Sequence, residues 1–430
     1  MVVTLAKRMD ARGASTKTTE LLAVAATEPA AQGRIVCRVR SRPGSLLHSG
    51  VSVGSYYLVH ALGATVPLVA GITLFGFRAL GAVAIVVGSA FFACLVWRRI
   101  GPRGRQMLPA QVLWMSLLVA LMLPAHLASD VPPASITTAS TGAPWPILAS
   151  AGLLVTMILW VTGGVGGGRF HAALYTMLLI WALFSAATHP QHVLARQHVI
   201  GGNLLDSSSP RLLAHPESWL RRPPDPGHDA FCTIPASQWM SLYTRGEIPV
   251  DRGRMPLLEL LRDHMPPLED LVVGGHPSPI GAASLIAVIV GGLFLMYRGV
   301  IDFRVPLLIV LTMYAALLVL PVPTVITETG PYYKWLIPRE PDVGWAAAVT
   351  FVNYQMTAGP AVFMAFYLAT APSLRPLGRR ARVIYAILIG LLSAGAQLYL
   401  SVAMGPYIAL VLVAMFAPML DRWLPPRTLV

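Results

Sequence analysis

The chain of 430 residues is 55% hydrophobic and only 12% charged, with a net charge of +13. Soluble domains carry about 25% charged residues, so this composition excludes an ordinary soluble domain. Several stretches hold about 18 or more nearly uncharged apolar residues, which is enough to cross a bilayer as a helix. We therefore predict an all-α polytopic membrane protein. Most arginines flank apolar stretches, so the positive charge indicates orientation in the lipid bilayer and not a nucleic-acid partner.

Residues 1–50 are polar and basic, and they contain no short apolar segment followed by a small-residue cleavage site. This pattern differs from a cleaved signal peptide. We expect a flexible cytoplasmic extension, because such a composition cannot bury much apolar surface.

The apolar stretches predict about ten membrane spans in two groups of five. The first transmembrane half is 51–188 and the second is 280–423, separated by a loop at 189–279 and followed by a tail at 424–430. The predicted spans are 56–75, 78–97, 108–127, 146–166, 170–188, 280–298, 304–323, 344–370, 382–400 and 403–420. Because "TAGPA" (357–361) interrupts the eighth span, we expect a kink or a break there.

Loop charges predict the orientation of these spans. The loops at 98–106 and 375–382 are strongly basic, whereas the loop at 128–145 has no Lys or Arg. The positive-inside rule then places both termini in the cytoplasm and the long loop 189–279 outside. Within that loop we expect short helices in "PRLLAHPESWLRR" (210–222) and "MPLLELLRDH" (255–264). A 5 + 5 arrangement is typical of an internally duplicated fold, although the halves share no convincing sequence identity.

Two glycine-rich turns are candidate ligand sites. The stretch "GGVGGGRFHAAL" (163–174) contains Gly163, Gly164, Gly166 and Phe170. Its glycines allow close backbone approach to a ligand, and the following helix start can face a phosphate. The alternative is a plain tight turn between packed helices.

The second turn, "GHPSPIGAASLIAV", leads through Gly281 and Ser284 into a span rich in small residues. Small residues at a helix start suit contact either with a cofactor or with a neighbouring helix. Both interpretations of these positions remain open.

The remaining polar residues argue against several functions. Three widely spaced cysteines and irregularly spaced loop histidines predict no metal site. His60 and His171 lie in predicted spans; we expect hydrogen-bonded histidines there, with haem ligation as the alternative. Few carboxylates fall inside the spans, which argues against a proton-coupled carrier. The outer loop also lacks the paired acids expected of a membrane glycosyltransferase.

A co-linear series of segments over most of residues 50–428 resembles the RnfD/NqrB family. The most specific are "VVGGHPSPIGAASLIAVIVGGLFLMYRGVIDFRVP" (272–306) and the stretch at 363–395 that contains "LATAPSLRPLGRRARV". The resemblance implies two inverted halves of five helices and a place in the bacterial inner membrane. It also implies partners, namely the other membrane and redox subunits of an ion-translocating oxidoreductase complex.

The resemblance further implies a loop that carries a covalently attached flavin. In the family, FMN is joined to a threonine in a motif like Ser-Gly-Ala-Thr-Pro-Leu. The corresponding residues here are Arg252, Gly253, Arg254, Met255 and Pro256, followed by a leucine. Methionine has no hydroxyl group, so covalent FMN is not expected. A non-covalent flavin (riboflavin or FMN) is compatible with this sequence, and Arg252 and Arg254 can meet a phosphate.

Other departures from the family pattern concern acidic residues. Family acids correspond to Ala282, to Ala371 and to a position at or near Pro109, and the family's Asn-Pro-Phe-Asn-Pro pattern retains only Phe170 and a following alanine. We therefore predict an electron-transport subunit that is not catalytic alone, with weakened or lost ion coupling and no catalytic residues of its own. The alternative is a solute transporter or channel with a similar inverted-repeat fold.

Overall fold

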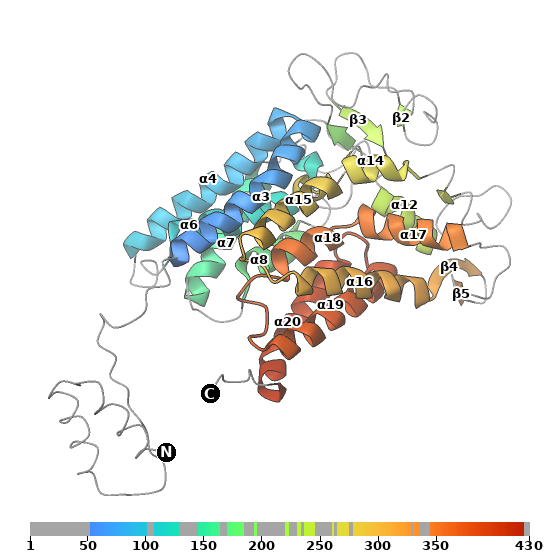
Figure 1. Ribbon diagram of the computed structural model, residues 1–430. Coiled ribbons are helices and arrows are strands. Elements are labelled where there is room, and N and C mark those ends of the chain that lie inside the picture. Colours follow the sequence, from blue (N-terminus) through green and yellow to red (C-terminus); the bar gives the residue numbers. More distant parts are fainter. Residues whose placement is uncertain are drawn as a thin grey trace, which may run out of the picture. The chain divides into compact units, whose positions relative to one another are not determined.

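The computed structural model describes most of the apolar part of the chain. The described residues are 52–100, 107–128, 145–163, 170–184, 193–195, 220–222, 230–233, 236–245, 260–261, 265–274, 278–327, 330–334 and 345–424. The N-terminal extension 1–50 and the tail beyond residue 424 lie outside them. Within these residues the structure consists of helices and two small β-sheets (Figure 1).

Five α-helices and a short 3₁₀ turn form the first half. They are α3 (Val53–Phe75), α4 (Phe77–Ile100), α6 (Pro109–Met122), η1 (Ala125–Ala128), α7 (Trp145–Thr162) and α8 (Ala172–Leu183). Ser52 caps α3, because its hydroxyl accepts a hydrogen bond of 3.0 Å from the Ser55 amide. Gly76 has a φ of 76° and allows the chain to turn from α3 directly into α4.

The second half contains five principal α-helices and three short helical turns. They are η3 (Ile280–Ala282), α15 (Leu285–Tyr297), α16 (Arg304–Val319), α17 (Trp345–Ala358), α18 (Ala361–Phe363), the π-helical turn η4 (Met364–Leu368), α19 (Arg379–Tyr399) and α20 (Gly405–Trp423). The predicted break at 357–361 is confirmed, because α17 ends at Ala358 and Pro360 precedes α18. Proline lacks an amide N–H and clashes with the preceding turn, so it kinks or ends a helix, and at Pro360 the helix is broken.

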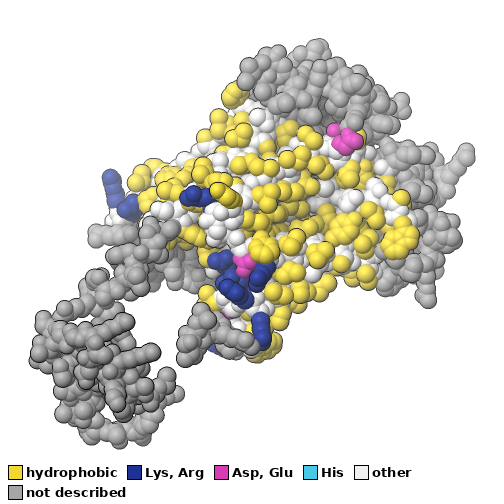
Figure 2. Space-filling model, in the orientation of Figure 1, with side chains coloured by type: hydrophobic (Ala, Val, Ile, Leu, Met, Phe, Trp, Pro, Cys, Tyr) yellow, Lys and Arg dark blue, Asp and Glu magenta, His cyan; other side chains and the backbone are white. Residues whose placement is uncertain are grey.

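Every predicted span contains one of these helices, and the class of polytopic all-α membrane protein is confirmed. Five helices are long and apolar enough to cross a membrane by length and composition, namely α3, α4, α7, α19 and α20. Four shorter apolar helices, α6, α8, α15 and α16, accompany them. The figure of about ten crossings, and their orientation, remain predictions. Apolar side chains cover much of the visible surface of the described helices, as expected where lipid replaces water (Figure 2).

The same helix pairing occurs in both halves. The second helix packs against the fourth, as α4 with α7 and as α16 with α19. In each pair a glycine of the fourth helix meets the backbone of the second. A Cβ atom at Gly152 would overlap the carbonyl oxygen of Val86, and one at Gly390 would overlap that of Ile309. This equivalence supports an internally duplicated arrangement.

The two halves meet where the first helix of each, α3 and α15, lie side by side (Figure 1). Tyr367, in the π-helical turn η4, contacts both of these helices. Its hydroxyl donates to the carbonyl oxygen of Gly63 over 3.1 Å and lies 3.4 Å from that of Val288. A side chain from the broken eighth span therefore holds the first helices of both halves together.

A second junction consists of extended backbone. The segment after α6 and the segment before α15 form an antiparallel bridge between Pro124 and Pro279. The Ile280 amide donates to the Leu123 carbonyl over 3.1 Å, and a second bond of 3.1 Å runs from the Ala125 amide to the Ser278 carbonyl. These bonds supply partners for backbone groups that no helix satisfies.

The loop 189–279 contains strands that the sequence did not predict. They are β1 (Val193–Ala195), β2 (Leu220–Arg222) and β3 (Ala230–Thr233), in the order β1-β3-β2, accompanied by the helices α12 (Ala236–Arg245) and α14 (Leu268–Val273). The prediction of a helix at 210–222 is wrong at its C-terminal end, because Leu220–Arg222 is a strand that pairs with β3. In the helix predicted at 255–264, only Leu260 and Leu261 are described; they are helical and buried. A further hairpin follows α16, with strands β4 (Val322–Thr327) and β5 (Gly330–Lys334).

The glycine contacts lead to a stability prediction. We expect Gly390→Ala to lower the thermal unfolding temperature of the purified protein, because the added methyl group must displace backbone and costs about 1–3 kcal/mol. The matched control is Gly395→Ala on the same helix, where a Cβ would meet nothing within 4 Å. The control should be neutral or slightly stabilising, since alanine is a better helix former than glycine. Equal unfolding temperatures for the two variants would contradict the close approach of α16 and α19.

Candidate functional site: a buried cluster of histidine and aromatic side chains

The predicted glycine-rich ligand turn is only partly described. Gly163 ends α7 with a φ of 86°, a conformation that favours glycine, and Gly164 and Gly166 lie outside the described residues. Phe170 is 56% exposed, and its ring contacts that of Tyr175 with centroids 5.4 Å apart. The predicted flavin-loop residues Arg252, Gly253, Arg254, Met255 and Pro256 also lie outside the described residues.

The second predicted turn packs against neighbouring helices. A Cβ atom at Gly281 would lie 2.6 Å from the Cβ of Leu121 and 3.1 Å from the ring of Phe363. Ser284 caps α15, with its hydroxyl accepting from the Ala287 amide over 3.4 Å. For these two positions the structure favours helix packing over cofactor contact.

A different set of polar side chains comes together at the starts of α3, α6 and α8. Tyr56 and His60 lie one turn apart on α3, Gln111 and Trp114 lie one turn apart on α6, and His171 immediately precedes α8. The ring centroids are 4.3 Å apart for Tyr56 and His60, 5.0 Å for His60 and Trp114, and 5.5 Å for Trp114 and His171. We call these five residues the histidine–aromatic cluster.

Most of the polar atoms in this cluster are buried without a hydrogen-bond partner among the described residues. His60, Gln111, Trp114 and His171 are each at most 5% exposed. The unpartnered atoms are the Tyr56 hydroxyl, His60 Nε2, Gln111 Oε1, Trp114 Nε1 and both ring nitrogens of His171. The Nδ1 of His60, by contrast, has a partner, the carbonyl oxygen of Tyr56 at 3.1 Å.

This pattern corrects the expectation for the two intramembrane histidines. His60 is hydrogen-bonded at one nitrogen, but His171 is not hydrogen-bonded at either nitrogen within the described residues. Buried polar groups in folded proteins nearly always have partners, because an unpaired group costs about 1–3 kcal/mol. So many unpaired groups in one place indicate a site for a polar ligand. The Trp114 ring contacts both imidazoles, which argues against a haem held between them.

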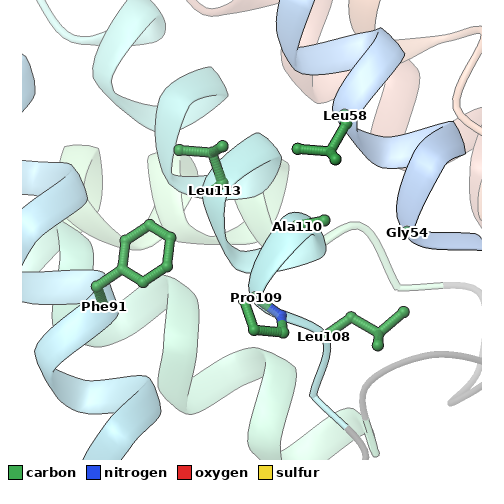
Figure 3. Close-up of a pocket in the computed structure, with 7 residues that line it drawn as sticks. All are labelled: Gly54, Leu58, Phe91, Leu108, Pro109, Ala110 and Leu113. Carbon is green, nitrogen blue, oxygen red and sulfur yellow. The ribbon is translucent and has the colours of Figure 1, made fainter.

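An open apolar groove lies between α3, α4 and the start of α6 (Figure 3). It has a volume of about 410 Å³ and is lined by Gly54, Leu58, Phe91, Leu108, Pro109, Ala110 and Leu113. Leu58 from α3 and Phe91 from α4 face the start of α6, where Pro109 is the first residue of the helix (Figure 3). The groove can take an apolar chain or ring edge, and it is lined by none of the five residues of the cluster.

The sequence interpretation considered only the two histidines of this cluster. It missed Tyr56, Gln111 and Trp114, although each lies three or four residues from another polar side chain near the start of an apolar helix. Such spacing places both side chains on one helix face. That three separate helix starts converge could not be read from these local patterns.

Comparison with known proteins agrees with the sequence resemblance. The D-subunit of the Na(+)-translocating ferredoxin:NAD(+) oxidoreductase complex of Acetobacterium woodii is 28% identical over 165 residues, which are 38% of this chain and 43% of the relative. The D-subunit of an ion-translocating oxidoreductase complex of Mannheimia succiniciproducens is 24% identical over 143 residues, which are 33% of this chain and 34% of the relative. The aligned parts thus span less than half of each relative.

The match to a family model is much longer than either pairwise alignment. The model described as the NQR2, RnfD, RnfE family matches residues 40–429, which include both helical halves and the loop between them. The resemblance inferred from the order of the segments is confirmed, and the chain belongs to the NQR2, RnfD, RnfE family.

Proposed function

We propose that this chain is a membrane subunit of an Rnf-type ion-translocating oxidoreductase complex and is not catalytic alone. Its partners are the other membrane and redox subunits of that complex, and it lies in the bacterial inner membrane with the loop 189–279 outside. The family match and the names of the two relatives support this assignment. The apolar helices support the membrane location.

Within this assignment we propose that the chain carries no covalent FMN. A phosphoester needs a hydroxyl oxygen, and Met255 offers only a thioether at the family's threonine position. The neighbouring Gly253 and Pro256 keep the family's residue types, so the loop retains features of the motif without the atom that forms the bond.

The histidine–aromatic cluster is the place in the structure that best suits a non-covalent flavin. An isoalloxazine ring presents carbonyl oxygens and ring nitrogens along one edge and flat aromatic faces. Gln111, Trp114 and His171 offer unpaired donors and acceptors for the edge, and the aromatic rings can stack on a face. A bound flavin would supply one- and two-electron redox chemistry. Arg375 is close enough to act electrostatically on Tyr56 and His60, and its charge suits the phosphate of FMN.

We also propose that direct ion coupling is weakened. Ala371, which is fully buried, and Ala282, in η3, stand where the family has acids. Among the described residues the carboxylates are Glu269, Asp270, Asp302 and Asp421, and they lie in a short loop helix, in a turn and in the last turn of α20. The middle of each described apolar helix therefore lacks an ionisable acid that could carry a cation or a proton.

Purification of the chain from its native membrane tests the assignment directly. We expect redox subunits to co-purify, and we expect any flavin to be released on denaturation, leaving a polypeptide without an FMN adduct by intact mass spectrometry. An FMN adduct on the native polypeptide would contradict the proposal. Solute flux in liposomes, with no redox partner and no flavin absorbance, would favour the transporter or channel alternative.

Restoring the hydroxyl group tests the interpretation of the loop. We expect Met255→Thr, expressed with a flavin transferase, to gain the mass of one FMN, because the threonine supplies the missing acceptor oxygen. Met255→Ala is the control and should gain none. Failure of the threonine variant to react, in a protein that is otherwise folded, would show that the loop has lost more than its acceptor atom.

Two tryptophans allow a matched test of the cluster. Trp114 and Trp160 each bury an unpartnered indole N–H, but Trp160 stacks on Trp97 and lies outside the cluster. We expect Trp114→Phe to lower the flavin content of the purified protein, with a loss of roughly tenfold or more in flavin affinity for one hydrogen bond removed. Trp160→Phe should leave the flavin content unchanged. Equal flavin content in both variants would place the flavin elsewhere.

A further inference from the structure

A patch of arginines lies where the turn between α15 and α16 meets the start of α19. Arg382 Nη1 and Asp302 Oδ2 form an ion pair of 3.2 Å that joins the turn to the helix. Basic side chains surround an acidic one on this face in Figure 2. The exposed members of the patch are Arg298, Arg304, Arg379 and Arg380.

The acids near this patch are already engaged. Besides the ion pair with Arg382, Asp302 accepts from the Arg304 amide over 3.3 Å. Asp421, from the end of α20, accepts from the amides of Leu377 and Gly378 over 2.8 and 3.4 Å. Among the described residues, Arg382–Asp302 is the only ion pair, so the four exposed arginines have no carboxylate partner there. The patch therefore has an excess of positive charge available to an external anion.

The patch borders an apolar surface that belongs in a bilayer. Tyr297 is 89% exposed and Phe303 is also exposed, and the Arg304 guanidinium lies 5.8 Å from the centre of the Phe303 ring. Leu307 and Leu311 are exposed at four-residue intervals along α16, so they continue the face that begins at Phe303. Aromatic residues with arginines at the end of an apolar helix mark the membrane–water boundary.

We propose that this patch binds the headgroup of an anionic phospholipid. The guanidinium groups meet the phosphate with paired hydrogen bonds, and an acyl chain lies along Phe303, Leu307 and Leu311. A phospholipid matches this surface because its headgroup can meet the arginines while its acyl chain covers the exposed apolar residues of α16. A soluble acidic protein would match the arginines alone and leave the exposed apolar residues of α16 uncovered.

Lipid binding to the purified full-length chain tests this proposal. Native mass spectrometry measures the retention of phosphatidylglycerol and, as the uncharged comparison, of phosphatidylcholine. We expect Arg379→Gln/Arg380→Gln to reduce the affinity for phosphatidylglycerol roughly tenfold or more, because each arginine near an anionic headgroup contributes on that scale. Arg379→Lys/Arg380→Lys, which keeps the charge but loses the planar fork, should lose less.

The matched control is Arg98→Gln/Arg99→Gln, which removes an equally exposed pair of arginines from the last turn of α4. It should retain nearly all of the phosphatidylglycerol affinity. Equal losses of phosphatidylglycerol affinity in both double variants would show that only the net charge of the protein matters. That result would overturn the proposal. Displacement of the lipid by inorganic phosphate would also overturn it, by showing a free-anion site. Unchanged lipid binding with loss of a co-purifying protein would assign the patch to a protein partner instead.

Discussion

Backbone N–H and C=O groups inside a bilayer must find their partners within the protein, because lipid offers none. This constraint is easy to meet in an unbroken helix and hard to meet where a helix stops early. The described part of the chain stops helices early in several places and supplies specific partners at each. The extended segments at Pro124 and Pro279 pair with one another. The Tyr367 hydroxyl donates to the carbonyl of Gly63, and the Gln397 side-chain amide donates to the carbonyl of Gln355 near the broken eighth span. The contacts between the two halves at Pro124–Pro279 and at Tyr367 thus depend on backbone groups that their own helices leave free.

The histidine–aromatic cluster has the opposite character. Its polar atoms are as deeply buried as those at the junctions, yet most of them have no partner within the part of the chain that the structure describes. Both the junctions and the cluster lie within one helical unit, so burial alone does not distinguish them. What distinguishes the two is whether their buried polar groups have hydrogen-bond partners. At the Pro124–Pro279 and Tyr367 junctions the named groups are paired and hold the two halves together, whereas the cluster contains unpaired groups and is the better candidate for binding a ligand.

Departures from the family pattern concern chemistry more than architecture. Gly281 and the glycines of α15 have packing roles, and Ser284 caps α15. Under our proposal, Met255, Ala282 and Ala371 take the places of the family's flavin-attachment threonine and acids, which serve chemistry. A charge at membrane depth is costly unless it is paired or used. A chain that no longer needs such a charge can replace it with alanine and keep its fold, which is consistent with the two helical halves of this protein.

The sequence by itself determined the membrane class, the positions of the helices and the break in the eighth span. Apolar length and proline chemistry act locally and can be read from consecutive residues. The absence of a hydroxyl at Met255 is visible in the sequence as well, and its meaning for flavin attachment stays a prediction. The sequence did not predict the strands of the loop, because segments such as Leu220–Arg222 are too short to show a pattern before pairing. Only the tertiary structure decided that Tyr56, Gln111, Trp114 and His171 share one site and that Gly152 and Gly390 occupy equivalent contacts. Those relations join residues far apart in the chain, and they exist only once the helices pack.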